Sequence, residues 1–102
     1  MKINFKANET VVKAQDTLFS SAEGEFKGKL IITNQRIYFK SYASSGEEFD
    51  FELLPGEIIE VIYYNKLRFI PIGLELKTKK GELLKFTLRD RDSWCRLITA
   101  MN

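Results

Sequence analysis

The stretch Gly28–Phe39, GKLIITNQRIYF, decides the fold that the sequence predicts. Its two apolar runs are separated by four polar residues, Thr33–Arg36. If Asn34 and Gln35 form a two-residue hairpin loop, the apolar side chains of both runs share one face of an antiparallel pair. The residues on that buried face are Leu30, Ile32, Ile37 and Phe39. Asn accepts the left-handed backbone that such a turn needs, and a four-residue loop from Thr33 to Arg36 keeps the same facing.

A second hairpin is predicted near the C-terminus. Apolar residues alternate with polar ones over Ile72–Leu76 and again over Leu84–Leu88. Only a three-residue loop, Lys79-Lys80-Gly81, brings both apolar sets to one face, with Gly81 in the left-handed third position. The same register sets Glu75 opposite Lys85, a pair of opposite charges that favours this alignment.

Further strand patterns lie before and between these hairpins. Val11–Ser20 predicts one long strand or two short ones, and residues 20–28, SSAEGEFKG, predict a polar loop. Phe49–Leu54 alternates as a strand that buries Phe49, Phe51 and Leu53 and exposes Asp50 and Glu52. A Pro55-Gly56 turn separates it from a strand over Glu57–Tyr64. The count is about seven antiparallel strands, typical of a small β-barrel.

The C-terminal segment has a helical period instead. Trp94, Leu97, Ile98 and Met101 follow each other at the spacing of one helix face. We expect a helix from about Asp90 to the C-terminus, with Asp90 or Asp92 at its N-terminal cap. The predicted fold is therefore all-β with one C-terminal helix, which closes an open end of the barrel.

Composition bounds the class of protein. The chain has 102 residues with 44% hydrophobic content, which fits a single globular domain over residues 1–102. Cys95 is the only cysteine, so no internal disulfide forms, which suits a reducing compartment. No run is long enough to span a bilayer, and the first ten residues lack the apolar stretch of a signal peptide. We expect a cytoplasmic protein, either free or peripheral at the inner face of the membrane.

The sequence argues against an enzyme. It contains no histidine, which removes serine–histidine and cysteine–histidine machinery and most zinc sites. The paired carboxylates Glu47 and Glu48 fit a solvated loop, and Asp90 and Asp92 fit helix capping better than metal binding. Cys95 stands beside a core-facing residue without an evident base, so it fits a small half-buried side chain. We expect no catalytic residue, metal or cofactor.

Charge is distributed unevenly along the chain. Residues 1–65 carry seven basic and ten acidic residues, a net −3, whereas residues 66–102 carry nine and four, a net +5. Such asymmetry can indicate an anionic partner. If the outward basic residues share one face, they are candidate contacts to anionic lipid. The candidates are Lys77, Lys79, Lys80, Lys85 and Arg89, with Arg91 beside them. The alternative is that these lysines protect an edge strand from aggregation.

The segment around residues 62–69, IYYNKLRF, predicts an apolar patch. With Asn65-Lys66 as a tight turn, the inward face holds Ile59, Val61, Ile70 and Ile72. The outward face then holds Ile58, Glu60, Ile62, Tyr64, Leu67 and Phe69, five of which are apolar or aromatic. Either another segment covers this face, such as Ile3–Phe5, or it is an interface. The candidate interface residues are Ile62, Tyr64, Leu67 and Phe69.

These motifs together resemble the GRAM domain family. GKLIITNQRIYF is similar to the family's signature hairpin, and residues 73–98, GLELKTKKGELLKFTLRDRDSWCRLI, are similar to its ending, over roughly residues 17–100 in all. The resemblance, to small bacterial-type members, implies a pleckstrin-homology (PH)-like barrel of seven strands in two near-orthogonal antiparallel sheets, closed by the helix. It also implies a non-catalytic module that associates with membrane lipid headgroups or with protein partners.

One departure concerns phosphoinositide binding. PH domains that bind these lipids share a basic pattern near the first hairpin, and the nearest matches here are Lys13, Lys27 and Lys29. Lys lacks the bidentate fork of Arg, and Glu23 and Glu25 lie in the adjoining loop, so tight binding there is not expected.

Arg36 is the most conspicuous single residue of the first hairpin. It could recognise a phosphate or carboxylate, but we favour stacking on an aromatic ring or bonding to nearby backbone. For the whole chain, the sequence predicts weak membrane association through the basic face. The alternative is a protein-interaction or homo-oligomerisation domain that uses the patch at residues 62–69. We expect no nucleic acid partner.

Overall fold

The computed structural model describes residues 6–22, 24–42, 50–66 and 70–101. Seven strands, one short 3-10 turn and one helix follow each other along the chain. They are β1 (Val11–Ser21), β2 (Gly24–Thr33), β3 (Ile37–Ser41), β4 (Phe51–Leu53), η1 (Pro55–Glu57), β5 (Ile58–Lys66), β6 (Ile70–Thr78), β7 (Leu83–Thr87) and α1 (Arg91–Ala100).

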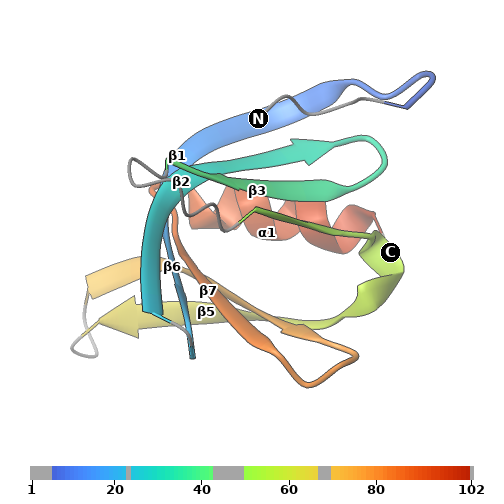
Figure 1. The fold of residues 1–102 in the computed structure, drawn as a ribbon. Coiled ribbons are helices and arrows are strands. Elements are labelled where there is room, and N and C mark those ends of the chain that lie inside the picture. The colour runs from blue at the N-terminus through green and yellow to red at the C-terminus, as the bar shows by residue number, and fades with distance from the viewer. Residues whose placement is uncertain (1–5, 23, 43–49, 67–69, 102) are drawn as a thin grey trace.

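All seven strands belong to one antiparallel sheet with the order β4-β3-β2-β1-β7-β6-β5. The sheet curls into a half-barrel in which β1 and β2 bend from the upper half into the lower half, with β3 above, β5–β7 below and α1 between the halves (Figure 1). Among the described residues, the two halves of the sheet pair through β1 and β7, where Phe19 pairs with Phe86 and Ser20 with Lys85. The predicted all-β fold with a C-terminal helix is confirmed, and the two expected sheets are two halves of one continuous sheet.

The first hairpin has the predicted facing. Leu30 pairs with Phe39 and Ile32 with Ile37. The turn is closed by the Thr33 hydroxyl, which accepts the Arg36 amide at 3.0 Å. The left-handed backbone expected at Asn34 is absent, because Asn8 is the only described non-glycine residue with a positive φ, 63°. The threonine side chain replaces the backbone bond that a left-handed turn would supply.

The second hairpin confirms the predicted loop. Gly81 has φ of 84°, and the amide of Thr78 donates to the carbonyl of Glu82 across the three-residue loop. Glu75 pairs with Lys85, as expected. At the far end of β6, a Cβ on Gly73 would lie 1.7 Å from the carbonyl oxygen of Phe86, so only glycine lets β6 and β7 approach this closely.

The segment at residues 20–28 is not a polar loop, and this prediction is wrong. β1 is one long strand to Ser21, and β2 begins at Gly24, so most of the segment is paired strand. Phe26 packs against the core while its neighbours Glu25 and Lys27 are exposed. The alternation of exposed and core-facing residues was present in the sequence, but the many polar residues of the segment favoured the interpretation as a loop.

Strand β4 is shorter than the pattern suggested. Leu53 is buried and Phe51 packs against the core, whereas Phe49 lies outside the described residues. Asp50 was expected to be exposed and is half-buried instead. One of its carboxylate oxygens accepts from the Ser41 backbone amide at 2.8 Å, which draws the side chain towards the neighbouring strand.

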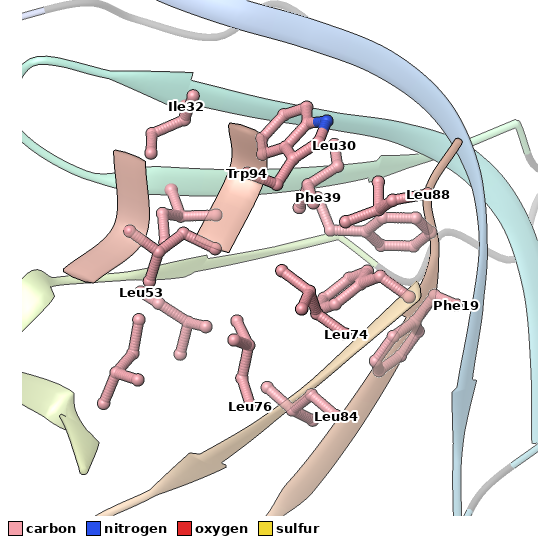
Figure 2. Close-up of a cluster of buried hydrophobic side chains, with 14 residues drawn as sticks. Phe19, Leu30, Ile32, Phe39, Leu53, Leu74, Leu76, Leu84, Leu88 and Trp94 are labelled. Atoms are coloured by element: carbon pink, nitrogen blue, oxygen red, sulfur yellow. The ribbon is translucent and has the colours of Figure 1, made fainter. Parts of the chain in front are cut away.

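The core is a cluster of aromatic and aliphatic side chains from every strand and the helix (Figure 2). Phe19 lies at the centre of the aromatic group, with ring centroids 5.0 Å from Phe39 and 5.1 Å from Phe86. Trp94 is fully buried, and its indole N–H donates to the amide oxygen of Gln15 on β1 at 3.0 Å. This bond and the apolar contacts fix α1 against the sheet.

Helix α1 presents the predicted face. Trp94 and Ile98 are buried, and Leu97 and Met101 pack against the core. Asp90 occupies the N-cap position but makes no capping hydrogen bond, because its carboxylate pairs with Lys13 at 3.3 Å. No helix in the described ranges is long and apolar enough to cross a membrane.

Strand β5 departs from its predicted register. Val61 pairs with Leu76 rather than with Ile70, and Lys66 pairs with Ile70 in place of a tight Asn65-Lys66 turn. A bulge between Ile58 and Glu60 exchanges the facing of the two isoleucines. Ile58, predicted outward, is therefore buried at 6% exposure, and Ile59, predicted inward, is 56% exposed. The predictions for Val61, which packs on the core, and Ile62, which is exposed, agree with the structure.

Candidate functional site

A buried ion-pair cluster occupies the end of the β2–β3 hairpin. The Arg36 guanidinium donates to both oxygens of Glu9, each at 2.8 Å, and to Glu52 at 2.5 Å. It also lies over the Tyr38 ring, 4.3 Å from the centroid. Because its guanidinium already binds two carboxylates and an aromatic face, Arg36 has a structural role. The expected stacking is confirmed, and Arg36 is a poor candidate for ligand recognition.

The cluster shifts the pKa of Glu9, Arg36 and Tyr38. Hydrogen bonds from Arg36 hold the pKa of Glu9 at about 2, despite burial, which acts in the opposite direction. Donating these hydrogen bonds to Glu9 and Glu52 raises the pKa of Arg36 in turn. Burial raises the pKa of Tyr38, and the nearby Glu9 charge adds to the effect. All three groups keep their usual charge at neutral pH.

The other polar residues of the same turn bind the N-terminal segment. The Asn34 side chain accepts from the amide of Thr10 at 2.9 Å and donates to the carbonyl of Asn8 at 2.9 Å. The Gln35 side chain donates to the carbonyl of Ala7 at 3.0 Å. All four residues Thr33–Arg36 therefore serve internal contacts, and we call Thr33–Arg36 with residues 6–10 the clamp. The clamp explains why polar residues interrupt the apolar hairpin.

The predicted basic residues do not form one uniform face. Lys77, Lys79 and Lys80 are exposed near the β6–β7 turn. Lys85 is half-buried opposite Glu75, and Lys77 faces Glu60 across β5 and β6. Along the β6–β7 hairpin, basic side chains thus lie opposite acidic ones, and an excess of basic residues, the lysine tip, remains only near the turn.

Two predicted arginines lie elsewhere. Arg89 is exposed beyond the opposite end of β7, next to the start of α1. Arg91 lies over the Tyr63 ring, 4.4 Å from the centroid. The hydroxyl of Tyr63 donates to Asp92 at 2.5 Å, and this bond raises the pKa of the tyrosine. Arg89 and Arg91 therefore belong to a different surface from the lysine tip.

The lysines of the first hairpin are divided in a similar way. Lys13 pairs with Asp90 and lies 5.9 Å from the Trp94 ring centroid, so it is held by the helix. Lys27 and Lys29 are exposed, with Lys29 paired to Asp16 on β1 and to Lys40 on β3. The basic pattern of lipid-binding PH domains is therefore incomplete here, because Lys13, one of the three nearest matches, is paired with the helix.

Strand β5 is one edge of the sheet and carries the predicted apolar patch in part. Ile62 is 40% exposed on the face that also holds Glu75 of β6. The side chains of Tyr64, Leu67 and Phe69 lie outside the described residues, as does the segment Ile3–Phe5 that was considered as a cover. Ile59 and Tyr63 are exposed as well, at 56% and 48%, and neither was predicted to be.

A cavity that sequence reasoning missed lies between β1, β4, η1 and the β6–β7 turn. It has a volume of about 240 Å³ and is lined by Phe19, Phe51, Leu53 and Leu84 with polar residues around them. The polar lining residues are Ser21, Glu52, Glu57, Lys80 and Glu82. No local sequence signal could reveal it, because its walls come from three segments that are distant in the chain, residues 19–21, 51–57 and 80–84.

Comparisons with known proteins place the fold. No protein family model matches the chain, and no curated protein matches it in sequence. Among solved structures, the C-terminal domain of an unknown protein from Leishmania infantum has a TM-score of 0.76 at 20% identity, covering 93% of this chain and 85% of its own. The Vps36 N-terminal PH domain has a TM-score of 0.65 at 16% identity, with 96% and 80% covered.

A third similar structure is the hSac2 domain from human phosphoinositide phosphatase Sac2, with a TM-score of 0.57 at 11% identity, covering 95% of this chain and 70% of its own. At these identities the similarity establishes the fold and nothing beyond it.

Proposed function

The chain has a PH-like fold, and from that premise we propose that it is a non-catalytic, protein-binding module, spanning residues 1–102, that recognises its partner through strand β5. The observation that carries the proposal is an edge strand of nine residues with only Glu60 and Lys66 charged and with Ile59 and Ile62 exposed. Exposed apolar edge strands attract further strands unless charges or proline protect them. β5 carries little such protection.

Strand addition supplies the mechanism. A partner segment in extended conformation would hydrogen-bond to the free backbone edge of β5, and its alternate side chains would cover Ile62. Bulges at both ends of β5 restrict pairing to the central residues Glu60–Tyr64. Such a short contact favours a reversible interaction, and the partner is either another protein or a second copy of this chain.

We further propose that the chain is a GRAM domain. In support, the first hairpin, the lysine–glycine turn and the C-terminal helix occur in the order of that family, and each forms the expected element. A family assignment alone does not specify the partner, since one fold supports many binding functions.

The test replaces Ile62 with a photo-crosslinking residue and, separately, with Asp. As a matched control, the same changes are made at Val12, which is 51% exposed on β1, a strand in the interior of the sheet. We expect a defined crosslinked species from position 62 and none from position 12. Light scattering then distinguishes self-association from a second protein. Identical patterns from the two positions would contradict the proposal.

The other candidate interface residues extend the same test to Leu67→Asp combined with Phe69→Asp. This double variant should weaken assembly and leave the fold intact, because the sequence predicts both residues on the outward face. Unchanged assembly in this variant and in Ile62→Asp would exclude the β5 region as the interface.

A second candidate function is weak attraction to an anionic membrane. The supporting observation is the exposed basic tip formed by Lys77, Lys79 and Lys80. Each lysine near an anionic surface contributes about 1 kcal/mol. Glu60, Glu75 and Glu82 stand beside these lysines and reduce the attraction, which is why we rank this function second.

Vesicle sedimentation tests this second function. Reversal of Lys79, Lys80 and Lys85 to Glu should abolish any binding to phosphatidylglycerol vesicles, and reversal of Arg89 should change it little. Binding should also weaken as salt rises, because exposed charges are screened over about 10 Å at 0.1 M ionic strength. Binding that survives both high salt and the triple reversal would show that the lysine tip is not the contact.

A further inference from the structure

The cavity between β4, η1 and the β6–β7 turn has an apolar floor. Phe19 is fully buried beneath it, and Leu53 and Leu84 are 5% and 7% exposed. In Figure 2, Leu84 lies at the opposite end of the core cluster from Trp94, so the cavity opens where α1 does not cover the core. Its volume of about 240 Å³ is below the range of about 300–1,000 Å³ usual for whole small ligands. A single side chain of a larger molecule is the appropriate size of occupant.

The rim of the cavity is acidic. Three carboxylates, Glu52, Glu57 and Glu82, line it against one ammonium, Lys80. Glu57 is held in place because its carboxylate accepts the amide of Leu54 at 3.0 Å. Glu82 accepts the hydroxyl of Thr78 at 3.4 Å. Each of these two carboxylates keeps one oxygen without a hydrogen bond to any described residue, so each can accept a further donor.

An aromatic floor with carboxylates around it fits a cation on an alkyl stem. The stem of a lysine or arginine buries against apolar surface while its charged end stays at the polar rim. Phe51, half-buried in the wall, adds an aromatic face that attracts a cation. A phosphate or other anion would meet two fixed carboxylates and is disfavoured.

The cavity continues into a larger open groove. The groove has a volume of about 610 Å³ and shares Ser21, Glu82 and Leu84 with the cavity. It forms where β1 and β7 separate beyond the Ser20–Lys85 pair, and Leu83 on its wall is 49% exposed. This groove gives room for residues that flank a basic side chain, which a free amine would not need.

We propose that this cavity is a recognition site for a lysine or arginine side chain of a partner protein, with the flanking residues of the partner in the adjoining groove. The site is separate from the β5 edge, so this inference goes beyond the proposed function and does not depend on it. Glu57 and Glu82 bind the cation, and Lys80 weakens the binding by repulsion.

The experiment titrates the whole chain with acetyl-Ala-Leu-Lys-Leu-Ala-amide and follows backbone amide shifts by NMR. The matched probe replaces lysine with norleucine, which keeps the stem and removes the charge. We expect saturable shifts at Glu57, Glu82 and Leu84 with the lysine peptide and none with the norleucine peptide. Equal binding of both peptides, or no saturable shift at these amides, would overturn the proposal.

Charge variants provide the second arm. Glu82→Gln should weaken the lysine peptide about tenfold, the usual effect of losing a charge-assisted hydrogen bond. Lys80→Gln should tighten it about twofold to threefold by removing an exposed like charge. Glu60→Gln, an exposed acid on β5 outside the cavity, is the matched control and should change nothing. If Lys80→Gln weakens binding, the assigned roles are wrong.

Two further probes exclude other occupants. If n-butylammonium displaces the peptide at equal concentration, the groove contributes nothing and a protein partner is not the occupant. If phosphatidylglycerol vesicles shift the same amides and the peptide does not, the site binds anions and the proposal fails. Ile62→Asp should leave the titration unchanged, so that failure here is distinguishable from failure at β5.

Discussion

The two hairpin turns of this molecule are closed by similar backbone hydrogen bonds but put their polar side chains to different uses. In each, a buried threonine closes the loop: the amide of Thr33 donates to the carbonyl of Arg36, and that of Thr78 donates to the carbonyl of Glu82. In the first turn, the remaining polar side chains bind residues 6–10 as the clamp. In the second, Lys79 and Lys80 are exposed. Polar residues in a turn are available for a partner only where no third segment of the chain uses them.

The largest effect should come from removing the cation of the clamp. Arg36→Leu leaves the buried Glu9 carboxylate without its counter-charge, and breaking one side of a buried pair costs about 3–5 kcal/mol. Urea denaturation measures the loss in the free energy of unfolding. The matched change in the other turn, Lys80→Leu, should stay within about 0.5 kcal/mol because the residue is exposed. A loss below 1 kcal/mol for Arg36→Leu would show that the clamp adds little to stability.

The clamp also predicts an acid dependence that the lysine turn does not share. The folded-state pKa of Glu9 is about 2, below its ordinary value of 4.5. A depressed carboxyl pKa stabilises the fold above the unfolded-state pKa, and this stabilisation is lost as the pH falls from about 4.5 towards 2. Glu9→Gln should lower stability at neutral pH and flatten this part of the profile.

Chemical denaturation at a series of pH values measures this profile, and Glu82→Gln in the second turn is the control. The control should keep the acid dependence of the unmodified chain. If Glu9→Gln and Glu82→Gln give the same profile, Glu9 is not the titrating group.

The same contrast indicates what the sequence could and could not predict. The second hairpin was predictable in full, because alternation and a glycine at the left-handed position are local signals. The clamp was not, because Glu9 and Arg36 are 27 positions apart and their side-chain pairing leaves no periodic trace. At the first turn, the sequence predicted the facing and the stacking of Arg36, but neither carboxylate partner.

The predicted register of strand β5 was wrong for a different reason. Adjacent isoleucines at Ile58 and Ile59 fit either face equally well, so alternation alone could not detect the bulge between Ile58 and Glu60. The error exchanged the two isoleucines and moved the turn. Likewise, the basic candidates were selected by composition. The sequence placed Lys85 opposite Glu75, but only the observed β5–β6 register reveals that Lys77 faces Glu60.

A smaller effect is expected from the neutral part of the clamp. Asn34→Ala removes two hydrogen bonds to residues 8–10, and a net contribution of about 0.5–1.5 kcal/mol each predicts a loss of about 1–2 kcal/mol at this exposed site. Lys79→Ala, the corresponding change in the lysine turn, should be close to neutral. Hydrogen exchange at the Thr10 amide should accelerate in Asn34→Ala alone. Unaltered exchange there would indicate that other contacts hold the N-terminal segment.

The smallest effect concerns the Glu75–Lys85 pair, the feature of the second hairpin that most resembles an ion pair of the first. The two residues are opposite each other on adjacent strands, but Glu75 and Lys85 are only half-buried. Cross-strand pairs of opposite charge contribute about 0.2–1 kcal/mol. Each single reversal, Glu75→Lys or Lys85→Glu, should therefore lose a few tenths of a kcal/mol, and the double reversal should recover most of it. A double-mutant cycle at low and high salt measures the coupling, which should shrink at high salt because the pair is accessible to ions. A coupling free energy as large as that between Arg36 and Glu9, or one that does not change with salt, would contradict this contrast. It would mean that the side chains of the two hairpins are used in the same way.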